Sequence, residues 1–129
     1  MTTIDIQVDC GNSPKREFIK DFNIAFATGN IEFLSACVSE DILWEIMGDK
    51  TISGKSEFIA AITEMAEYKA SKLVIHQVLT HGKEAASNGY MYLEVEPGVK
   101  YCFSDFYEFV SAGKTIIKHL RSYVIKVTD

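Results

Sequence analysis

Apolar residues recur at helical spacing in the first half of the chain. Ser13-Pro14 opens the first stretch, because serine is a good helix cap and proline suits the first helical position. Gly29 ends this helix, and Asn30 caps a second, short one. The apolar positions are Phe18, Phe22, Ala25 and Phe26 in the first helix and Ile31, Leu34 and Val38 in the second.

The apolar period changes to two from residue 72 onward, which is typical of β-strands. A third helix is predicted before this change, near residues 56–68. Turns are expected at Gly82-Lys83, Pro97-Gly98 and Ala112-Gly113. The predicted strands are at about 42–47, 72–81, 84–95, 99–110 and 114–127, with a possible short edge strand at 4–8.

This order of elements indicates an α+β domain. We expect a curved antiparallel sheet packed on three helices from the N-terminal half, in a single domain over residues 1–129 with its core at about 13–127. A chain of this length can bury a core without disulfides or metals. A strongly curved sheet against helices leaves an interior cavity, which the apolar strand faces would line.

Composition excludes several classes of function. The 129 residues are 47% hydrophobic and carry a net charge of −5 without a run of Lys or Arg, so we expect no binding to nucleic acid or to a membrane surface. The sequence shows neither a secretory signal nor an apolar run of about 20 residues. Three widely spaced cysteines are typical of reduced thiols, which predicts a cytoplasmic protein.

Two carboxylates stand out because each lies on an otherwise apolar strand face. Side chains alternate along a strand, so Asp105 is flanked on its own face by Phe103 and Tyr107. Glu45 is flanked in the same way by apolar residues two positions away on each side. A poorly solvated acid has a raised pKa, which suits it to proton transfer in a pocket. The alternative is an ordinary polar network or a subunit contact.

The orientation of two strands stays open at this stage. A change of register by one residue would turn Glu45 to solvent and Trp44 inward. His119 is a candidate ligand-binding and proton-transfer residue. Alternatively, His119, Arg121 and Tyr123 form a polar convex face used in dimerisation. The cavity-facing residues of the last strand would then be Lys118, Leu120, Ser122 and Val124.

Motifs for metals and cofactors are absent from the sequence. His76 and His81 share a strand but alternate in face, and no HxH, HExxH or CxxC spacing occurs. There is no Gly-rich phosphate loop and no nucleophile elbow. We therefore predict neither a metal site nor a cofactor.

Three groups of residues resemble the nuclear-transport-factor-2-like superfamily, over roughly residues 13–127. Within it, the chain is similar to SnoaL-like polyketide cyclases and ketosteroid isomerases. The resemblance implies a cone-shaped α+β fold. The residues that carry it are Phe26-Ala27-Thr28-Gly29-Asn30, then Trp44-Glu45-Ile46-Met47-Gly48 with Ile52-Ser53-Gly54, and Asp105-Phe106-Tyr107-Glu108-Phe109 with Gly113-Lys114 and Arg121-Ser122-Tyr123.

The isomerase pattern implies roles for particular positions. Its general base corresponds to Glu45, ahead of Gly48, and its second, protonated acid corresponds to Asp105, ahead of Gly113. Phe22 stands where these enzymes have an oxyanion-stabilising tyrosine. Its ring has no hydroxyl, which argues against steroid isomerase activity. The Arg-x-Asp strand motif of the epoxide-hydrolase branch is absent.

Taken together, these features predict a homodimer that binds a hydrophobic small molecule. An enzyme of this kind would isomerise, cyclise or dehydrate a hydrophobic carbonyl compound without a cofactor, with Glu45 as base and Asp105 as acid or hydrogen-bond donor. The alternative is a non-catalytic ligand-binding or dimerisation module. The candidate catalytic residues are Asp105 and Glu45, and the candidate ligand-binding residues are Phe22, Phe26, Trp44, Phe103, Tyr107 and His119.

Overall fold

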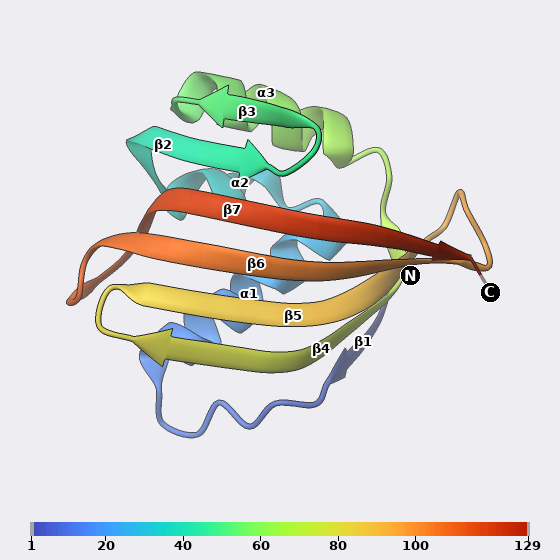
Figure 1. Cartoon of the computed structure of the whole chain (residues 1–129), viewed down its shortest axis with the longest axis horizontal. Helices are drawn as coiled ribbons and strands as arrows, with labels where there is room; N and C mark the ends of the chain where they lie inside the picture. The colour runs from blue at the N-terminus through green and yellow to red at the C-terminus, as the bar shows by residue number, and fades with distance from the viewer. Residues whose placement is uncertain (1, 129) are drawn as a thin grey trace.

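Three helices lie on one face of a curved sheet of seven strands in the computed structural model, which describes residues 2–128 (Figure 1). The helices are α1 (Pro14–Thr28), α2 (Ile31–Ala36) and α3 (Lys55–Met65). The strands are β1 (Thr3–Ile6), β2 (Val38–Ile46), β3 (Lys50–Ser53), β4 (Ala70–His81), β5 (Glu84–Leu93), β6 (Val99–Ser111) and β7 (Lys114–Thr128). The predicted α+β class is confirmed. The ends of the predicted domain, residues 1 and 129, lie outside the described residues.

The sheet has the strand order β1-β4-β5-β6-β7-β2-β3. Strands β4 to β7 form the predicted antiparallel meander (Figure 1). However, β1 runs parallel to β4 and β2 runs parallel to β7, so the sheet is mixed where an antiparallel one was predicted. Helices separate these partners along the chain, and such crossovers permit parallel pairing. Strand β3 pairs with β2 in a segment for which no strand was predicted.

The predicted caps of the first two helices are confirmed, whereas the third helix ends at Met65, three residues earlier than predicted. Ser13 accepts a hydrogen bond from the Arg16 amide at 3.2 Å at the start of α1, and Gly29 ends α1 in the left-handed region with φ of 74°. Asn30 caps α2 through the Phe33 amide at 3.2 Å. Val38, predicted as a helical position, is instead the first residue of β2, where pairing with β7 buries it.

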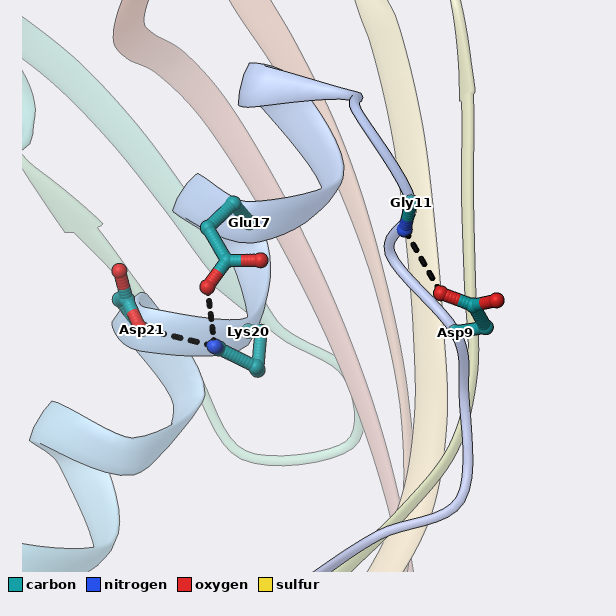
Figure 2. A network of polar contacts seen from close by, with 5 residues as sticks. All are labelled: Asp9, Gly11, Glu17, Lys20 and Asp21. Atoms are coloured by element: carbon teal, nitrogen blue, oxygen red, sulfur yellow. Dashed lines mark hydrogen bonds and ion pairs between the residues drawn. The ribbon is translucent and has the colours of Figure 1, made fainter.

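The solvent side of α1 is held by local polar contacts. Lys20 forms ion pairs with Glu17 and Asp21, and the Asp9 carboxylate accepts a hydrogen bond from the Gly11 amide at 2.8 Å just before the helix (Figure 2). Exposed ion pairs of this kind contribute only about 0–1 kcal/mol each. The orientation of α1 therefore depends on its opposite, apolar face.

The hydrophobic core lies between the helices and the sheet face that they cover, which we call the inner face. We call the opposite face of the sheet the outer face. The largest fully buried side chains come from all three helices and from the sheet, which ties the two layers together. Among them are Ile19, Phe22, Leu34, Phe58, Phe109 and Leu120.

Strands β4 and β5 approach each other unusually closely at Gly89. A Cβ atom on Gly89 would lie 2.0 Å from the carbonyl oxygen of Val74, closer than any real contact. The register of the β4–β5 pair also shifts between Ile75 and Gln77, opposite this point. Glycine is therefore required here by space rather than by backbone conformation.

Candidate functional site

An interior cavity of about 190 Å³ lies between the helices and the inner face of the sheet. Its wall is mostly apolar, with aromatic and aliphatic side chains from helices α1 and α3 and from five strands. The aromatic lining residues are Phe22, Phe26, Trp44 and Phe103, and the aliphatic ones are Ala27, Ile46, Met65, Leu73, Met91, Leu120 and Val124. Val124 is 49% exposed, so the cavity opens to solvent beside it.

Asp105 is the only carboxylate that lines this cavity among the residues described. Strand register places it opposite Ser87 on β5 and Ser122 on β7, so these three residues form a polar row across the apolar inner face. Asp105 keeps some accessible surface, but that surface faces the cavity. Protein therefore surrounds the carboxyl on its other sides.

A hydrogen-bonded network connects this polar row to helix α1. The Asn23 amide donates to the Tyr107 hydroxyl at 3.0 Å, to the Ile19 carbonyl at 2.9 Å and more weakly to Ser87 at 3.4 Å. The hydroxyls of Ser87 and Tyr107 lie 2.8 Å apart, and Tyr107 is also hydrogen-bonded to Asp105. Asn23 and Ser87 are buried, and the amide nitrogen of Asn23 and the hydroxyl of Ser87 are hydrogen-bonded within the network.

On the other side of Asp105, Trp44 and Ser122 form a short chain of hydrogen bonds that ends at the carboxyl. The indole Nε1 of Trp44 donates to the Ser122 hydroxyl at 3.0 Å. Ser122 accepts this hydrogen bond with a lone pair, so its own proton remains available. It donates that proton to Asp105, to which it is hydrogen-bonded. Hydroxyls of Ser122 and Tyr107 thus meet the carboxyl from two sides.

Burial raises the pKa of Asp105 to about 6, although the hydrogen bonds with Ser122 and Tyr107 act in the opposite direction. The charged carboxyl loses water, and the two hydroxyls replace only part of it. Burial, together with the charge of Asp105, raises the pKa of Tyr107 well above its usual value. The phenol therefore keeps its proton at neutral pH, and Asp105 is the group that titrates there.

The prediction that Glu45 shares this cavity with Asp105 is wrong. Trp44 and Ile46 line the cavity, so the alternation of β2 turns Glu45 to the outer face. There its carboxylate accepts a hydrogen bond from Arg121 Nε at 3.0 Å and lies 3.6 Å from Nε2 of His119. The two acids lie on opposite faces, and Glu45 is held in an ion pair.

His119 also lies on the outer face, where it lines a groove of about 470 Å³ with Arg121 and Tyr123. Its Nε2 atom is buried and has no hydrogen-bond partner among the described residues. Lys118, predicted to face the cavity if His119 faced outward, instead lies 3.5 Å from Glu108 on β6. The reason is a bulge: β7 places both Lys118 and His119 opposite Glu108, so Lys118 does not alternate inward.

The remaining candidate ligand-binding residues lie at or beside the cavity. Phe22, Phe26, Trp44 and Phe103 line it. Tyr107 is not a lining residue, because its ring packs edge-on against Phe22 at 5.9 Å and its hydroxyl reaches Asp105 from the side. Its position suits a supporting role rather than direct contact with a ligand.

Asn23, Ser87 and Ser122 are site residues that sequence reasoning missed or left without a role. Each is a polar residue at a buried position of an apolar face, which is a usable signal. Asn23 follows Phe22 directly on α1, and Ser122 was expected only to face the cavity. The hydrogen bonds that link them around Asp105 join elements far apart in the sequence.

Two features are absent from the part of the chain that the structure describes. Among residues 2–128, no three His, Cys, Asp or Glu side chains gather in a way that could hold a metal ion. In the same range, none of the helices is long and apolar enough to cross a membrane.

Comparison with known proteins identifies a family. The sequence profile of the SnoaL-like domain family matches residues 19–119. Among curated proteins, none matches the sequence.

Several solved structures share the fold. A candidate SnoaL-like polyketide cyclase from Shewanella denitrificans has a TM-score of 0.74 at 12% identity, covering 88% of this chain and 92% of that one. A candidate ketosteroid isomerase from Kribbella flavida has a TM-score of 0.71 at 16% identity, covering 89% and 80%. An LEH-like epoxide hydrolase from M. tuberculosis has a TM-score of 0.72 at 17% identity, covering 86% and 82%. At such low identity, the likeness shows the fold alone.

Proposed function

Because the chain belongs to the SnoaL-like domain family, we propose that it binds a small, mostly apolar molecule in the interior cavity, with Asp105 as the polar anchor. The observation that carries this proposal is a single buried carboxyl in a mostly apolar, partly open cavity. Protein cores are close-packed, and an unfilled cavity of this size costs on the order of a few kcal/mol. A cavity retained at that cost, with a titratable group in its wall, is typical of a ligand site.

A second candidate function is acid/base catalysis on a hydrophobic carbonyl compound. It is favoured by the pKa of Asp105, which burial raises to about 6. A general base works best when its pKa lies near the working pH, and this value is close to neutral pH. Asp105 would take a proton from a carbon next to the carbonyl and return it at another position, as an isomerase or cyclase requires. Against this, Glu45 cannot act as a partner acid or base from the outer face.

Cyclohexanone tests both functions in one experiment. Trp44 is the single tryptophan of the chain and lines the cavity, so a bound ketone should quench its fluorescence. In D2O, catalysis by Asp105 would exchange the hydrogens next to the carbonyl for deuterium, which mass spectrometry detects. Val124→Phe at the cavity mouth should lower the affinity for cyclohexanone, as measured by quenching, at least about tenfold, because the added ring would fill the opening.

The matched control is Val127→Phe, three residues along the same exposed strand and not part of the cavity wall. It should leave the quenching unchanged. Equal loss in both variants would contradict binding in this cavity, and no saturable quenching in the natural protein would remove ketones as its ligands. Saturable quenching without Asp105-dependent exchange would leave binding as the function and remove catalysis.

We further propose that the outer face of the sheet forms a homodimer. Large apolar side chains are exposed on this face. Acidic and basic side chains lie beside them in ion pairs, including Glu45–Arg121 and Lys118–Glu108. A surface with apolar residues and both charges can complement itself across a two-fold axis. The exposed side chains are Leu79 at 60%, Phe106 at 46%, Tyr123 at 41% and Ile125 at 67%.

Light scattering at tens of micromolar protein should therefore give twice the chain mass. Phe106→Glu should give the monomer mass, because a buried, unpaired carboxylate would destabilise the interface. Val95→Glu is the matched control, since Val95 is 60% exposed outside the sheet. A monomeric natural protein, or a dimer that survives Phe106→Glu, would argue against this interface.

A further inference from the structure

The charge of Asp105 is not balanced by any cation that the described part of the chain places in the cavity wall. The cavity wall contains no Lys, Arg or His among residues 2–128. Burial raises the pKa of Asp105 and, in the same range, the only groups that act against it are two neutral hydroxyls, those of Ser122 and Tyr107. At neutral pH the carboxyl is therefore ionised in an apolar cavity without an opposite charge. A buried charge in this situation gains most from a ligand that brings the missing charge.

The side-chain donors around the cavity are already engaged with one another. The two N–H groups of the Asn23 amide are shared among three acceptors, and the Trp44 indole donates to Ser122. Ser122 in turn is hydrogen-bonded to Asp105. No side-chain donor of the described cavity wall is left for a ligand carbonyl, which would enter the cavity without a hydrogen bond. A ligand donor, by contrast, finds the free lone pairs of Asp105.

The size of the cavity limits the ligand to about one ring. Its volume of about 190 Å³ is well below the roughly 300–1,000 Å³ typical of pockets for drug-sized ligands. Along the wall, the ring of Phe26 contacts those of Phe22 and Trp44, at centroid distances of 5.2 and 5.5 Å. Aromatic rings attract cations through their electron-rich faces, in addition to providing apolar contact.

We propose that the ligand of this cavity is a small apolar amine, with one ring or a comparable hydrocarbon group, whose ammonium group pairs with the Asp105 carboxylate. This inference rests on the proposed binding function and names the chemical class that the site selects. The hydrocarbon part fills the space between the aromatic wall and the mouth at Val124, and the ammonium group donates to the lone pairs that Ser122 and Tyr107 leave free.

Three ring compounds of nearly equal size test this selection. Cyclohexylamine is a cation at pH 7.5, cyclohexanol is a neutral donor, and cyclohexanone only accepts hydrogen bonds. Affinities are measured by calorimetry and by displacement of cyclohexanone, which restores Trp44 fluorescence. We expect cyclohexylamine to bind on the order of ten- to hundredfold more tightly than the other two, as a charge-assisted hydrogen bond requires.

Asp105→Asn provides the matched variant, because it keeps the shape of the side chain and removes its charge. The preference for cyclohexylamine should disappear, while the affinity for cyclohexanol should change by no more than about twofold. If cyclohexanol or cyclohexanone binds as tightly as the amine, the amine proposal is overturned and the binding function stands. If none of the three binds, both are overturned. The comparison within the natural protein decides the question even if the variant is unstable.

Discussion

Replacing Asp105 by Asn should make the protein's stability less dependent on pH, with a gain for the variant that appears only as the pH rises toward neutral. Burial raises the pKa of Asp105 from 3.8 to about 6 in the folded state. At pH values between these two, the folded state holds a proton that the unfolded state has released. The free energy of unfolding therefore falls as the pH increases through this window.

The expected size of the effect follows from the width of the window. A shift of about two units, at about 1.4 kcal/mol per unit, corresponds to roughly 3 kcal/mol. The natural protein should lose this amount relative to Asp105→Asn between about pH 4 and pH 7. The measurement is a series of urea unfolding curves for both proteins across this range. Groups other than Asp105 contribute to both curves and cancel in the difference.

A second variant tests the physical cause of the shift. Ser122→Ala removes a hydroxyl whose hydrogen bond lowers the pKa of Asp105, so the upper end of the window should move to higher pH. A difference between the natural protein and Asp105→Asn that stays flat from pH 4 to pH 7 would contradict burial of the ionised carboxyl.

Gly89→Ala should destabilise the fold by at least about 3 kcal/mol, although it adds one methyl group. That methyl would lie 2.0 Å from the carbonyl oxygen of Val74, which is backbone and cannot rotate away. Strands β4 and β5 would have to separate, with loss of their hydrogen bonds at this point. Chemical denaturation monitored by circular dichroism measures the change.

Gly113→Ala is the matched control for this prediction. Gly113 lies in the turn between β6 and β7, and a Cβ atom there meets nothing within 4 Å. Its free energy of unfolding should change by no more than about 1 kcal/mol. If Gly89→Ala is as stable as Gly113→Ala, the close approach of the two strands is not present in solution.

Alternation along β6 correctly predicts that Asp105 faces inward, because only one face of this strand is consistently apolar. Tyr101, Phe103, Tyr107 and Phe109 share its parity and form the apolar face that packs inward. The segment around Glu45 allows two solutions, since apolar residues occupy both faces of β2. Burial of the large Trp44 ring against Phe26 and Phe58 favours the observed orientation. Glu45 then pairs with Arg121, which β7 places directly opposite it on the outer face. That pairing is parallel and depends on the fold as a whole.

The network around Asp105 lies beyond what periodicity can predict. Asn23, Ser87 and Tyr107 come from α1, β5 and β6, and their hydrogen bonds join residues up to 84 positions apart. A pattern along one element shows that a polar residue is buried, but not which partner satisfies it. The mixed sheet was missed for the same reason, because the partners of β1 and β2 are set by crossovers.

The bulge on β7 affects how related sequences can be compared. Ile117 and Leu120 both face inward although three positions separate them, because Lys118 and His119 together oppose one residue of β6. A relative whose last strand lacks the extra residue would match this chain on one side of the bulge and be displaced by one position on the other. Without a gap at this point, an alignment would equate cavity residues such as Ser122 with residues of the outer face. Site comparisons across the family therefore depend on where that single gap is placed.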